Sequence, residues 1–360
     1  MAELTSCSPN PERMTASVAL ASFQGGRYLE AQLASIVAQS DPPDEIVVTD
    51  DGSTDETYAI LARFASSSSI PIRIIKNSER LGFTRNFARA ISLCRSELIF
   101  LCDQDDIWAN GKIERMKEEF KDPDVLLAYH GALVVSEENE PLYEFYQTKR
   151  ERKYLQTLPM DPWYSSYGLT QAFRASLRKF DDLWPVSLNH VWLENETLSH
   201  DQWYFFLAQV LGRVAYVGES LVRYRQHGTN SVGAKWVDTG GGVFRRVARK
   251  FSHEPRLDHL RSRAAERRAL ILSRISERMD PGNKEDSAIL SAYYGILQDR
   301  LGRRYDCYTA QTILKRASAF AKMIRFRDYR AAPWGFRVRS IGRDFVRGVV
   351  VGSTPLIPKR

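Results

Sequence analysis

The amino-acid sequence predicts an α/β protein with a mostly parallel sheet flanked by helices and a mainly helical C-terminal extension. Short apolar runs typical of buried strands alternate with helix-like segments between residues 16 and 135. Two of these runs end in aspartate clusters, and the last third of the chain is basic. Strands that alternate with helices pair in parallel and need helical cover on both faces of the sheet.

The composition is that of a globular protein. Of the 360 residues, 43% are hydrophobic and 26% are charged, which suits one large domain or two of ordinary size. The apolar runs are shorter than the roughly 18 residues that a membrane-spanning helix needs. The first residues lack the pattern of a secretory signal, and the four cysteines show no CxxC spacing. We therefore expect a cytoplasmic protein with reduced cysteines.

Charge divides the chain into parts. Residues 235–360 contain 28 Lys and Arg against 12 Asp and Glu, a net charge of +16. Residues 1–234 contain 23 against 32, a net charge of −9. We expect a disordered lead-in over 1–14, a main domain over 15–234 and a basic helical region over 235–360.

The individual elements follow from the spacing of apolar residues. We expect strands over 17–22, 45–49, 70–76, 97–102 and 124–135. We expect helices over 26–40, 56–64, 81–94, 107–120 and 199–212. Residues 213–233 indicate strand, turn, strand and loop, whereas residues 141–200 are aromatic-rich and irregular.

The stretch LIFLCDQDDIW places three aspartates directly after a strand-like run. Two carboxylates about 4 Å apart repel by roughly 4 kcal/mol at an intermediate dielectric. A Mg²⁺ or Mn²⁺ ion that binds Asp103 and Asp105 would offset this repulsion. The alternative is a solvated acidic turn, and we expect Asp106 to cap a helix that begins near Trp108.

A second acidic cluster, DDGSTD, follows the strand-like run EIVVT. Asp50 or Asp51 could accept hydrogen bonds from a nucleobase or a ribose. The alternative is an ordinary turn in which Asp55 caps the next helix. There is no GxGxxG after the first strand and no GxxxxGK[ST], which argues against a dinucleotide site and a P-loop. Because ligands bind beyond the carboxyl ends of parallel strands, we expect both clusters to meet at one site.

These motifs together, with HD at 200–201 and YRQHGTN at 224–230, resemble a known family. Residues 16–233 are similar to the nucleotide-sugar-binding half of family 2 glycosyltransferases, and DQDDIW is similar to their rhamnosyltransferase-like branch. The resemblance implies the GT-A fold of nucleotide-diphospho-sugar transferases. It also implies transfer of a sugar, with rhamnose the leading candidate, from a UDP- or dTDP-linked donor.

The resemblance also implies roles for individual residues. Asp201 matches the catalytic base, and Asp103, Asp105 and His227 match the residues that bind Mn²⁺ or Mg²⁺. The first-strand motif reads Ala-Ser-Phe-Gln here instead of the usual Thr-Tyr-Asn. This departure puts the contacts of the usual Thr and Asn side chains in doubt, whereas backbone contacts could survive. The implied donor-binding residues are Ala21, Phe23, Asp50, Asp51, Arg85 and Gln104.

Elementary chemistry agrees with an inverting reaction. A divalent cation stabilises the diphosphate that leaves, and one carboxylate deprotonates the attacking hydroxyl group. Other interpretations stay open: Asp201 as a helix cap, His200 as a structural residue and His227 as an ordinary loop histidine. Rival functions are a nucleotidyltransferase and a nucleotide-sugar-binding protein without activity.

The expected partners follow from the same considerations. The donor is a nucleotide sugar, and the acceptor is a glycan or a lipid-linked glycan. The basic C-terminal region suits an anionic membrane surface at the inner face of the cell membrane, or packing on a partner subunit. No RNA- or DNA-binding module is recognisable, and we expect no nucleic acid partner.

Overall fold

The computed structural model describes residues 13–147, 154–155, 162–189, 196–228, 255–279, 284–329 and 340–351. Most of the expected lead-in over 1–14 lies outside these residues. The chain forms two compact units. The first comprises Met1–Thr157, Ser165–Lys179 and His200–Gly233, and the second comprises Leu158–Tyr164, Phe180–Ser199 and Ala234–Arg360.

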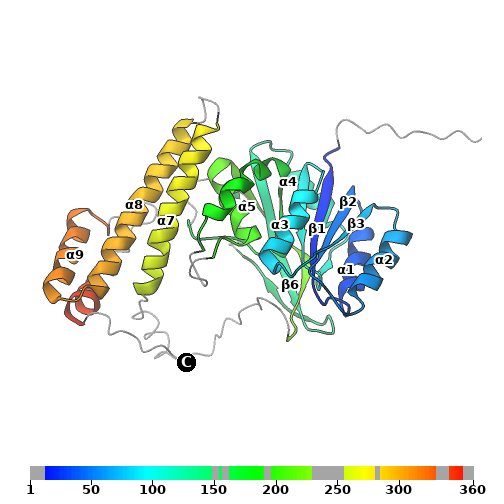
Figure 1. Ribbon diagram of the computed structural model, residues 1–360, viewed down its shortest axis with the longest axis horizontal. Helices are drawn as coiled ribbons and strands as arrows, with labels where there is room; N and C mark the ends of the chain where they lie inside the picture. Colours follow the sequence, from blue (N-terminus) through cyan, green and yellow to red (C-terminus); the bar gives the residue numbers. More distant parts are fainter. Residues whose placement is uncertain are drawn as a thin grey trace, which may run out of the picture. The chain divides into compact units, whose positions relative to one another are not determined.

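The first unit is built on one large sheet (Figure 1). Its parallel half consists of β3 (Ile72–Lys76), β2 (Glu45–Asp50), β1 (Ala16–Ser22) and β4 (Leu98–Cys102), in that spatial order. The sheet continues through β9 (Gln171–Arg174), β6 (Val125–Val135), β10 (Arg213–Arg225) and β5 (Ile107–Trp108). Two further strands lie off this path, β7 (Pro141–Phe145) beside β6 and β8 (Tyr154–Leu155) beside β10.

Most strands run in parallel, as the sequence predicts. β9 is the main exception, because it runs antiparallel to both of its neighbours, β4 and β6. Two reversals restore the original direction, so β6 and its parallel partner β10 point the same way as β4. The carboxyl ends of these strands therefore lie along one edge of the sheet.

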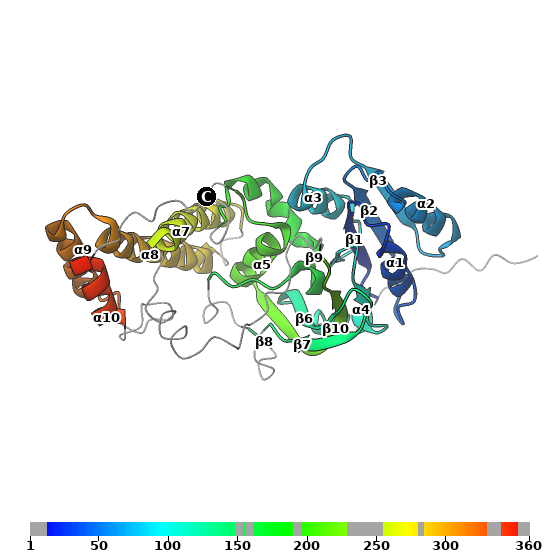
Figure 2. The same ribbon diagram turned by 90° about the horizontal axis from the view of Figure 1, so that it is seen from below.

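Helices cover both faces of this sheet (Figures 1 and 2). The helices of the first unit are α1 (Leu29–Val37), α2 (Thr57–Ser67), α3 (Phe83–Leu93), α4 (Lys112–Glu119) and α5 (His200–Leu211). α3 contacts β1 and β2, whereas α5 contacts β6 and β10. Every residue of β2 and β4 is buried, which explains why β4 and the centre of β2 are continuously apolar instead of alternating. The polar residues at the ends of β2, Glu45, Thr49 and Asp50, are hydrogen-bonded.

The segment from 141 to 189 contains more regular structure than its composition predicts. Besides β7 and β9 it holds two 3₁₀ segments, η1 (Gly168–Thr170) and η2 (Ala175–Val186). β9 has only four residues, and it inserts into the centre of the sheet. Such a short strand carries no periodic signal, so the sequence could not place it.

The second unit is mainly helical, in agreement with the prediction. Its elements are α7 (Pro255–Glu277), α8 (Lys284–Thr309), α9 (Ile313–Arg325), α10 (Ser340–Arg343) and η4 (Asp344–Val351). α7 and α8 pack along their length (Figure 1). Leu260, Ala264, Ile271 and Ile275 recur on one buried face of α7, the spacing of an amphipathic helix. Among the described residues, no helix is both long and apolar enough to cross a membrane.

Candidate active site

Two acidic loops and a histidine meet at the carboxyl edge of the sheet. β1 lies between β2 and β4, and Ser22 and Leu20 of β1 pair with Asp50 and Cys102, near the ends of those strands. DQDD follows β4 immediately, and His227 follows β10 by two residues. The parallel arrangement therefore brings the two acidic loops to one edge, as the sequence predicts. It also brings His227 to that edge, more than 100 residues further along the chain.

Asp105 and His227 are in direct contact. The Nε2 atom of His227 lies 2.8 Å from Oδ2 of Asp105. Both side chains are largely shielded, with 7% of His227 and 16% of Asp105 exposed. The ring of Tyr28 lies 4.8 Å from the His227 ring, and the Tyr28 hydroxyl donates a hydrogen bond of 2.7 Å to Glu137. This packing holds the imidazole beside the carboxylate.

Asp103 is electrostatically coupled both to Asp105 and to the predicted base, Asp201. Burial, and after it the nearby carboxylates of Asp105 and Asp201, together raise the pKa of Asp103 to about 7. The influence of Asp201 places its carboxylate within electrostatic reach of Asp103, although 98 positions separate them in the sequence. The three aspartates therefore form one electrostatic group.

Asp201 occupies the first turn of α5, and its Oδ1 atom accepts the backbone N–H of Gln202 at 2.9 Å. The helix already begins at His200, so Asp201 does not precede the helix as a cap residue would. The His200 ring stacks on Phe87 at 3.9 Å, and burial lowers the pKa of His200 to about 4. This contact favours a structural role for His200, since a buried neutral ring packs well on Phe87.

Asp106 does not cap a helix, and that expectation is wrong. Ile107 and Trp108 form β5, which pairs with β10, so the helix starts only at Lys112. Asp106 is buried, and its Oδ1 atom accepts the backbone N–H of Arg225 at 3.0 Å. Its Oδ2 atom has no hydrogen-bond partner within the described residues. Burial and the neighbouring aspartates hold the pKa of Asp106 well above its usual range.

Arg225 ties β10 to the DQDD loop, a role that the sequence did not reveal. Its side chain is buried, and Nε donates to the backbone carbonyl of Asp105 at 3.0 Å. A second guanidinium nitrogen donates to the carbonyl of Glu137. The guanidinium lies 4.9 Å from the Tyr28 ring centre. Arg225 therefore fixes the backbone on which Asp105 stands.

A buried lysine lies beneath the acidic loop. Lys112 is fully buried, and its Nζ atom donates to the carbonyl of Leu169 at 2.8 Å and lies 3.9 Å from the Trp108 ring centre. Burial lowers the pKa of Lys112 to about 7, against the influence of Cys102, Asp106 and Asp103. Its positive charge in turn opposes the rise in the pKa of Asp103.

The predicted donor residues Asp50 and Asp51 organise the loops around them. Asp50 accepts hydrogen bonds from the hydroxyls of Ser22 and Ser53 at 2.9 and 2.6 Å. Asp51 accepts the backbone N–H groups of Leu81 and Gly82 at 2.7 and 2.8 Å. Both carboxylates are almost completely buried. Each one holds a loop at the carboxyl edge of the sheet in a defined conformation.

Gln104 clamps the loop after β1. Its Oε1 atom accepts the N–H of Phe23 at 2.8 Å, and its Nε2 atom donates to the Phe23 carbonyl at 2.9 Å. Gln24, which follows Phe23, has a positive φ of 51°, and its side-chain Oε1 atom accepts the N–H of Thr54 at 2.9 Å. These amides link the first-strand loop to both acidic loops. Ala21 lies within β1, one residue before its end.

Two arginines flank the first-strand loop differently. Arg80, which the sequence did not single out, lies with its guanidinium 4.0 Å from the Phe23 ring centre. Arg85, the predicted diphosphate neighbour, is exposed on α3 and makes no hydrogen bond or ion pair within the described residues. The structure thus brings Arg80, rather than Arg85, against a predicted donor residue.

Asp105 and His227 could provide some, but not all, of the ligands of a divalent cation. Asp105 and His227 offer a carboxylate oxygen and an imidazole nitrogen side by side, a pair that suits Mn²⁺. Across the described part of the chain, no group of three His, Cys, Asp or Glu side chains could hold a metal ion by itself. Phosphate oxygens of a bound nucleotide commonly complete such a site.

Comparison with known proteins agrees with the geometry. Residues 17–184 match the model of Glycosyl transferase family 2, so this segment is a family 2 glycosyltransferase domain. The chain is 32% identical over 131 residues to the uncharacterized protein MT1568 of Mycobacterium tuberculosis, a match that covers 36% of this chain and 40% of that protein. It is 26% identical over 220 residues to the dTDP-rhamnosyl transferase RfbG of Shigella flexneri, covering 60% and 74% of the two chains.

The fold is also shared with a solved structure. The crystal structure of S. aureus TarS 1-349 in complex with UDP-GlcNAc superimposes with a TM-score of 0.50 at 16% sequence identity. The superposition covers 87% of this chain and 92% of that one. The predicted GT-A fold class is therefore confirmed.

Proposed function

We propose that this chain is an inverting, metal-dependent glycosyltransferase that moves a sugar from a nucleotide donor to a hydroxyl of a glycan or lipid-linked glycan. The observation that carries the proposal is the contact between Asp105 and His227, with Asp103 in electrostatic reach of Asp201. Asp103 and Asp105 belong to the segment that matches Glycosyl transferase family 2, and Asp201 and His227 follow that segment in the same compact unit.

Asp201 is the proposed general base. As the acceptor oxygen attacks the anomeric carbon, its proton passes to the Asp201 carboxylate. The bond between the anomeric carbon and the donor diphosphate breaks on the opposite face, so the configuration inverts. The first turn of α5 holds Asp201, and the packing of His200 on Phe87 fixes that turn.

Asp105 and His227 are the residues that would hold Mn²⁺ or Mg²⁺, with Asp103 beside them. The cation supplies a Lewis acid that stabilises the negative charge on the leaving diphosphate. Arg225 and Lys112 support this arrangement. Arg225 fixes the Asp105 backbone, and Lys112 supplies positive charge to the carboxylates.

The donor-binding part of the proposal includes Ala21, Phe23, Asp50, Asp51, Arg85 and Gln104. The hydrogen bonds of Asp50, Asp51 and Gln104 support a role in shaping the loops against the donor. The similarity to a protein named dTDP-rhamnosyl transferase favours dTDP-rhamnose as the donor. We further propose that residues 15–234 act as the transferase domain and that the basic C-terminal region attaches it to the inner face of the cell membrane.

The test separates binding from transfer in the variant Asp201→Asn. We expect Asp201→Asn to bind dTDP or UDP like the wild type while sugar transfer falls by about 10²–10⁴-fold, the range for loss of a general base. Nucleotide release from a panel of dTDP- and UDP-sugars measures transfer, and calorimetry measures binding. The control Asp124→Asn removes an exposed carboxylate of the same unit and should leave both unchanged. Wild-type transfer by Asp201→Asn would exclude Asp201 as the base.

The same assay distinguishes the rival functions. A nucleotidyltransferase would consume a nucleoside triphosphate and release pyrophosphate instead of a nucleoside diphosphate. A binding protein without activity would bind the nucleotide sugar and release no nucleotide from any donor, even with glycan acceptors present. Either result would replace the proposed function.

A further inference from the structure

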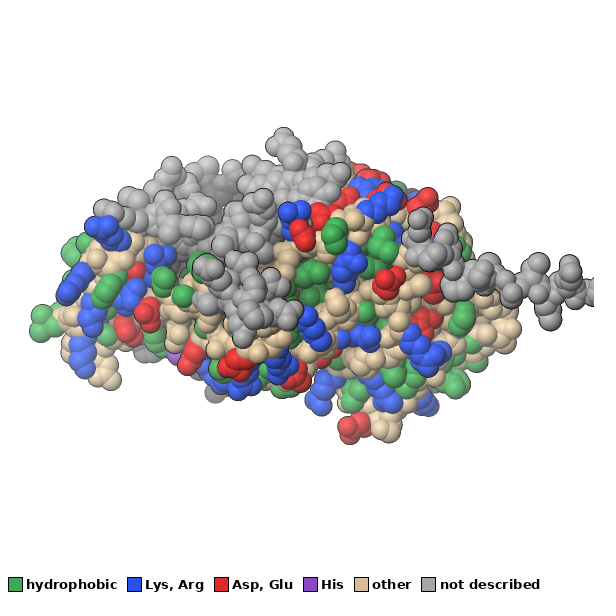
Figure 3. All heavy atoms as spheres, turned by 90° about the horizontal axis from the view of Figure 1, so that it is seen from above, with side chains coloured by type: hydrophobic (Ala, Val, Ile, Leu, Met, Phe, Trp, Pro, Cys, Tyr) green, Lys and Arg blue, Asp and Glu red, His purple; other side chains and the backbone are tan. Residues whose placement is uncertain are grey.

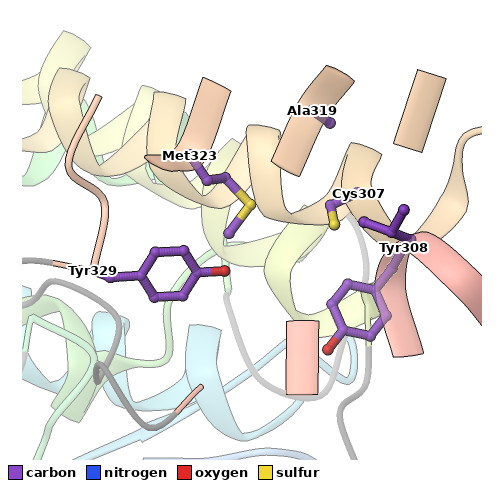
Figure 4. Packing of buried hydrophobic residues seen from close by; sticks show 6 residues of the cluster. Cys307, Tyr308, Ala319, Met323 and Tyr329 are labelled. Atoms are coloured by element: carbon purple, nitrogen blue, oxygen red, sulfur yellow. The ribbon is translucent and has the colours of Figure 1, made fainter. Parts of the chain in front are cut away.

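Helix α9 of the second unit has two apolar faces, and only one of them is buried. Ala319 and Met323 point into a small core that Cys307, Tyr308 and Tyr329 also form (Figure 4). This cluster anchors α9 to the rest of the unit, so the helix is a fixed part of the fold.

The second apolar face points outward. Ile313, Leu314 and Ile324 are 52%, 80% and 47% exposed. At about 100° of rotation per residue, these three and the exposed Ala321 lie within about 100° of arc. We call these four residues the outer face of α9, whereas Ala317 packs against the core cluster. An apolar strip of this kind on a fixed helix marks an interaction surface.

Positive charge borders this outer face. The segment 313–327 contains five Lys or Arg residues and no Asp or Glu. Lys315, Lys322 and Arg325 are exposed and lie on the side of the strip beyond Leu314. Arg316 instead bonds to the carbonyls of Val349 and Ala310. Figure 3 shows that apolar and basic side chains lie next to each other on the surface of the protein.

The adjacent element η4 extends the apolar surface. Phe345 and Val346 are 48% and 54% exposed, and the Phe345 ring lies 5.5 Å from the ring of Phe320 on α9. Phe326, just after α9, is also exposed. An exposed apolar strip with cations along one border is the pattern of a helix that lies in the interface of an anionic membrane.

We propose that the outer face of α9 docks onto an anionic lipid surface, with its apolar residues among the headgroups and its cations on acidic lipids. The charge argues for lipid and against a second copy of this chain, because two such faces would bring like charges together. The inference rests on the proposed membrane attachment and assigns it to a particular surface.

Vesicle sedimentation of the full chain tests this proposal. We expect binding to vesicles of phosphatidylglycerol and phosphatidylcholine at low salt, with much weaker binding to phosphatidylcholine alone and loss at high salt. Lys315→Gln/Lys322→Gln should lower the affinity for vesicles about tenfold or more, since each basic residue near the surface contributes roughly 1 kcal/mol. Leu314→Ser/Ile324→Ser should also lower it about tenfold or more, since less apolar area enters the headgroup region. The matched controls Leu142→Ser and Lys76→Gln/Lys121→Gln alter exposed residues of the first unit and should bind like the wild type.

Several results would contradict docking of α9 onto an anionic lipid surface. Absence of wild-type binding, or full binding by both α9 variants, would overturn the proposal. So would a dimer, seen by light scattering, that Leu314→Ser/Ile324→Ser abolishes in a chain that binds no vesicles. Sugar transfer to a water-soluble acceptor without vesicles separates the proposed reaction from the proposed lipid docking. This assay tests the reaction alone, and its rate should not change in the α9 variants.

Discussion

Gly25 and Gln104 should be strongly coupled in their effect on stability. A Cβ atom at Gly25 would lie 2.3 Å from Oε1 and 2.7 Å from Cδ of Gln104. Gln104 cannot simply turn away, because its amide makes both hydrogen bonds to the Phe23 backbone. Gly25→Ala therefore has the same structural consequence as removing the Gln104 amide.

The magnitude follows from these two hydrogen bonds. At about 1 kcal/mol each, Gln104→Ala should lower the free energy of unfolding by about 2 kcal/mol. Gly25→Ala should also cost about 2 kcal/mol, because it forces the same amide out. The double variant should cost about 2 kcal/mol rather than the sum, which gives a coupling energy of about 2 kcal/mol.

Urea unfolding of the four proteins measures this cycle. Gly111→Ala and Gln311→Ala are the matched controls, since nothing lies within 4 Å of a Cβ atom at Gly111 and Gln311 is exposed. Both should stay within about 0.5 kcal/mol of the wild type. Costs that add within about 0.5 kcal/mol in the double variant would refute the clamp.

Two further variants test the surroundings of the predicted base and of Asp105. Burial lowers the pKa of His200 from about 6.5 in the unfolded chain to about 4 in the folded chain, so the free energy of unfolding should fall by about 3 kcal/mol as pH drops from 6.5 to 4. His200→Phe should remove this part of the pH dependence. If urea unfolding shows the same difference in stability between pH 7 and pH 5 for His200→Phe as for the wild type, the reasoning is contradicted. Arg225→Met should lower the free energy of unfolding by about 2–4 kcal/mol and weaken nucleotide binding, because the Asp105 and Glu137 carbonyls lose a charged donor. The exposed control Arg63→Met should change neither quantity. An Arg225→Met protein with wild-type stability and wild-type nucleotide affinity would show that Arg225 does not hold the DQDD loop.

The sequence could predict the frame of the fold because that frame is local. β4 and the centre of β2 are continuous apolar runs, and the aspartates at or just after the ends of these strands mark their carboxyl ends. Parallel pairing then brings these ends to one edge without further information. The approach of His227 to Asp105 depended on the family resemblance, because 122 positions separate the two residues.

What the sequence could not predict depends on polar contacts between distant segments. Gln104 and Arg225 act by bonding to backbone groups of Phe23 and Asp105, and such bonds leave no periodic pattern. The error at Asp106 has the same origin. β5 is held by its pairing with β10. Because of this pairing, α4 begins only at Lys112 and not near Trp108, where local propensity would start it.

The most direct test of the donor site is calorimetric titration of dTDP and UDP with and without Mn²⁺. We expect binding that requires Mn²⁺ and that Asp105→Asn weakens at least about tenfold, while Asp124→Asn and Asp201→Asn bind like the wild type. Metal-independent binding that Asp105→Asn leaves unchanged would contradict the assignment of Asp105 and His227 to the metal end of the site.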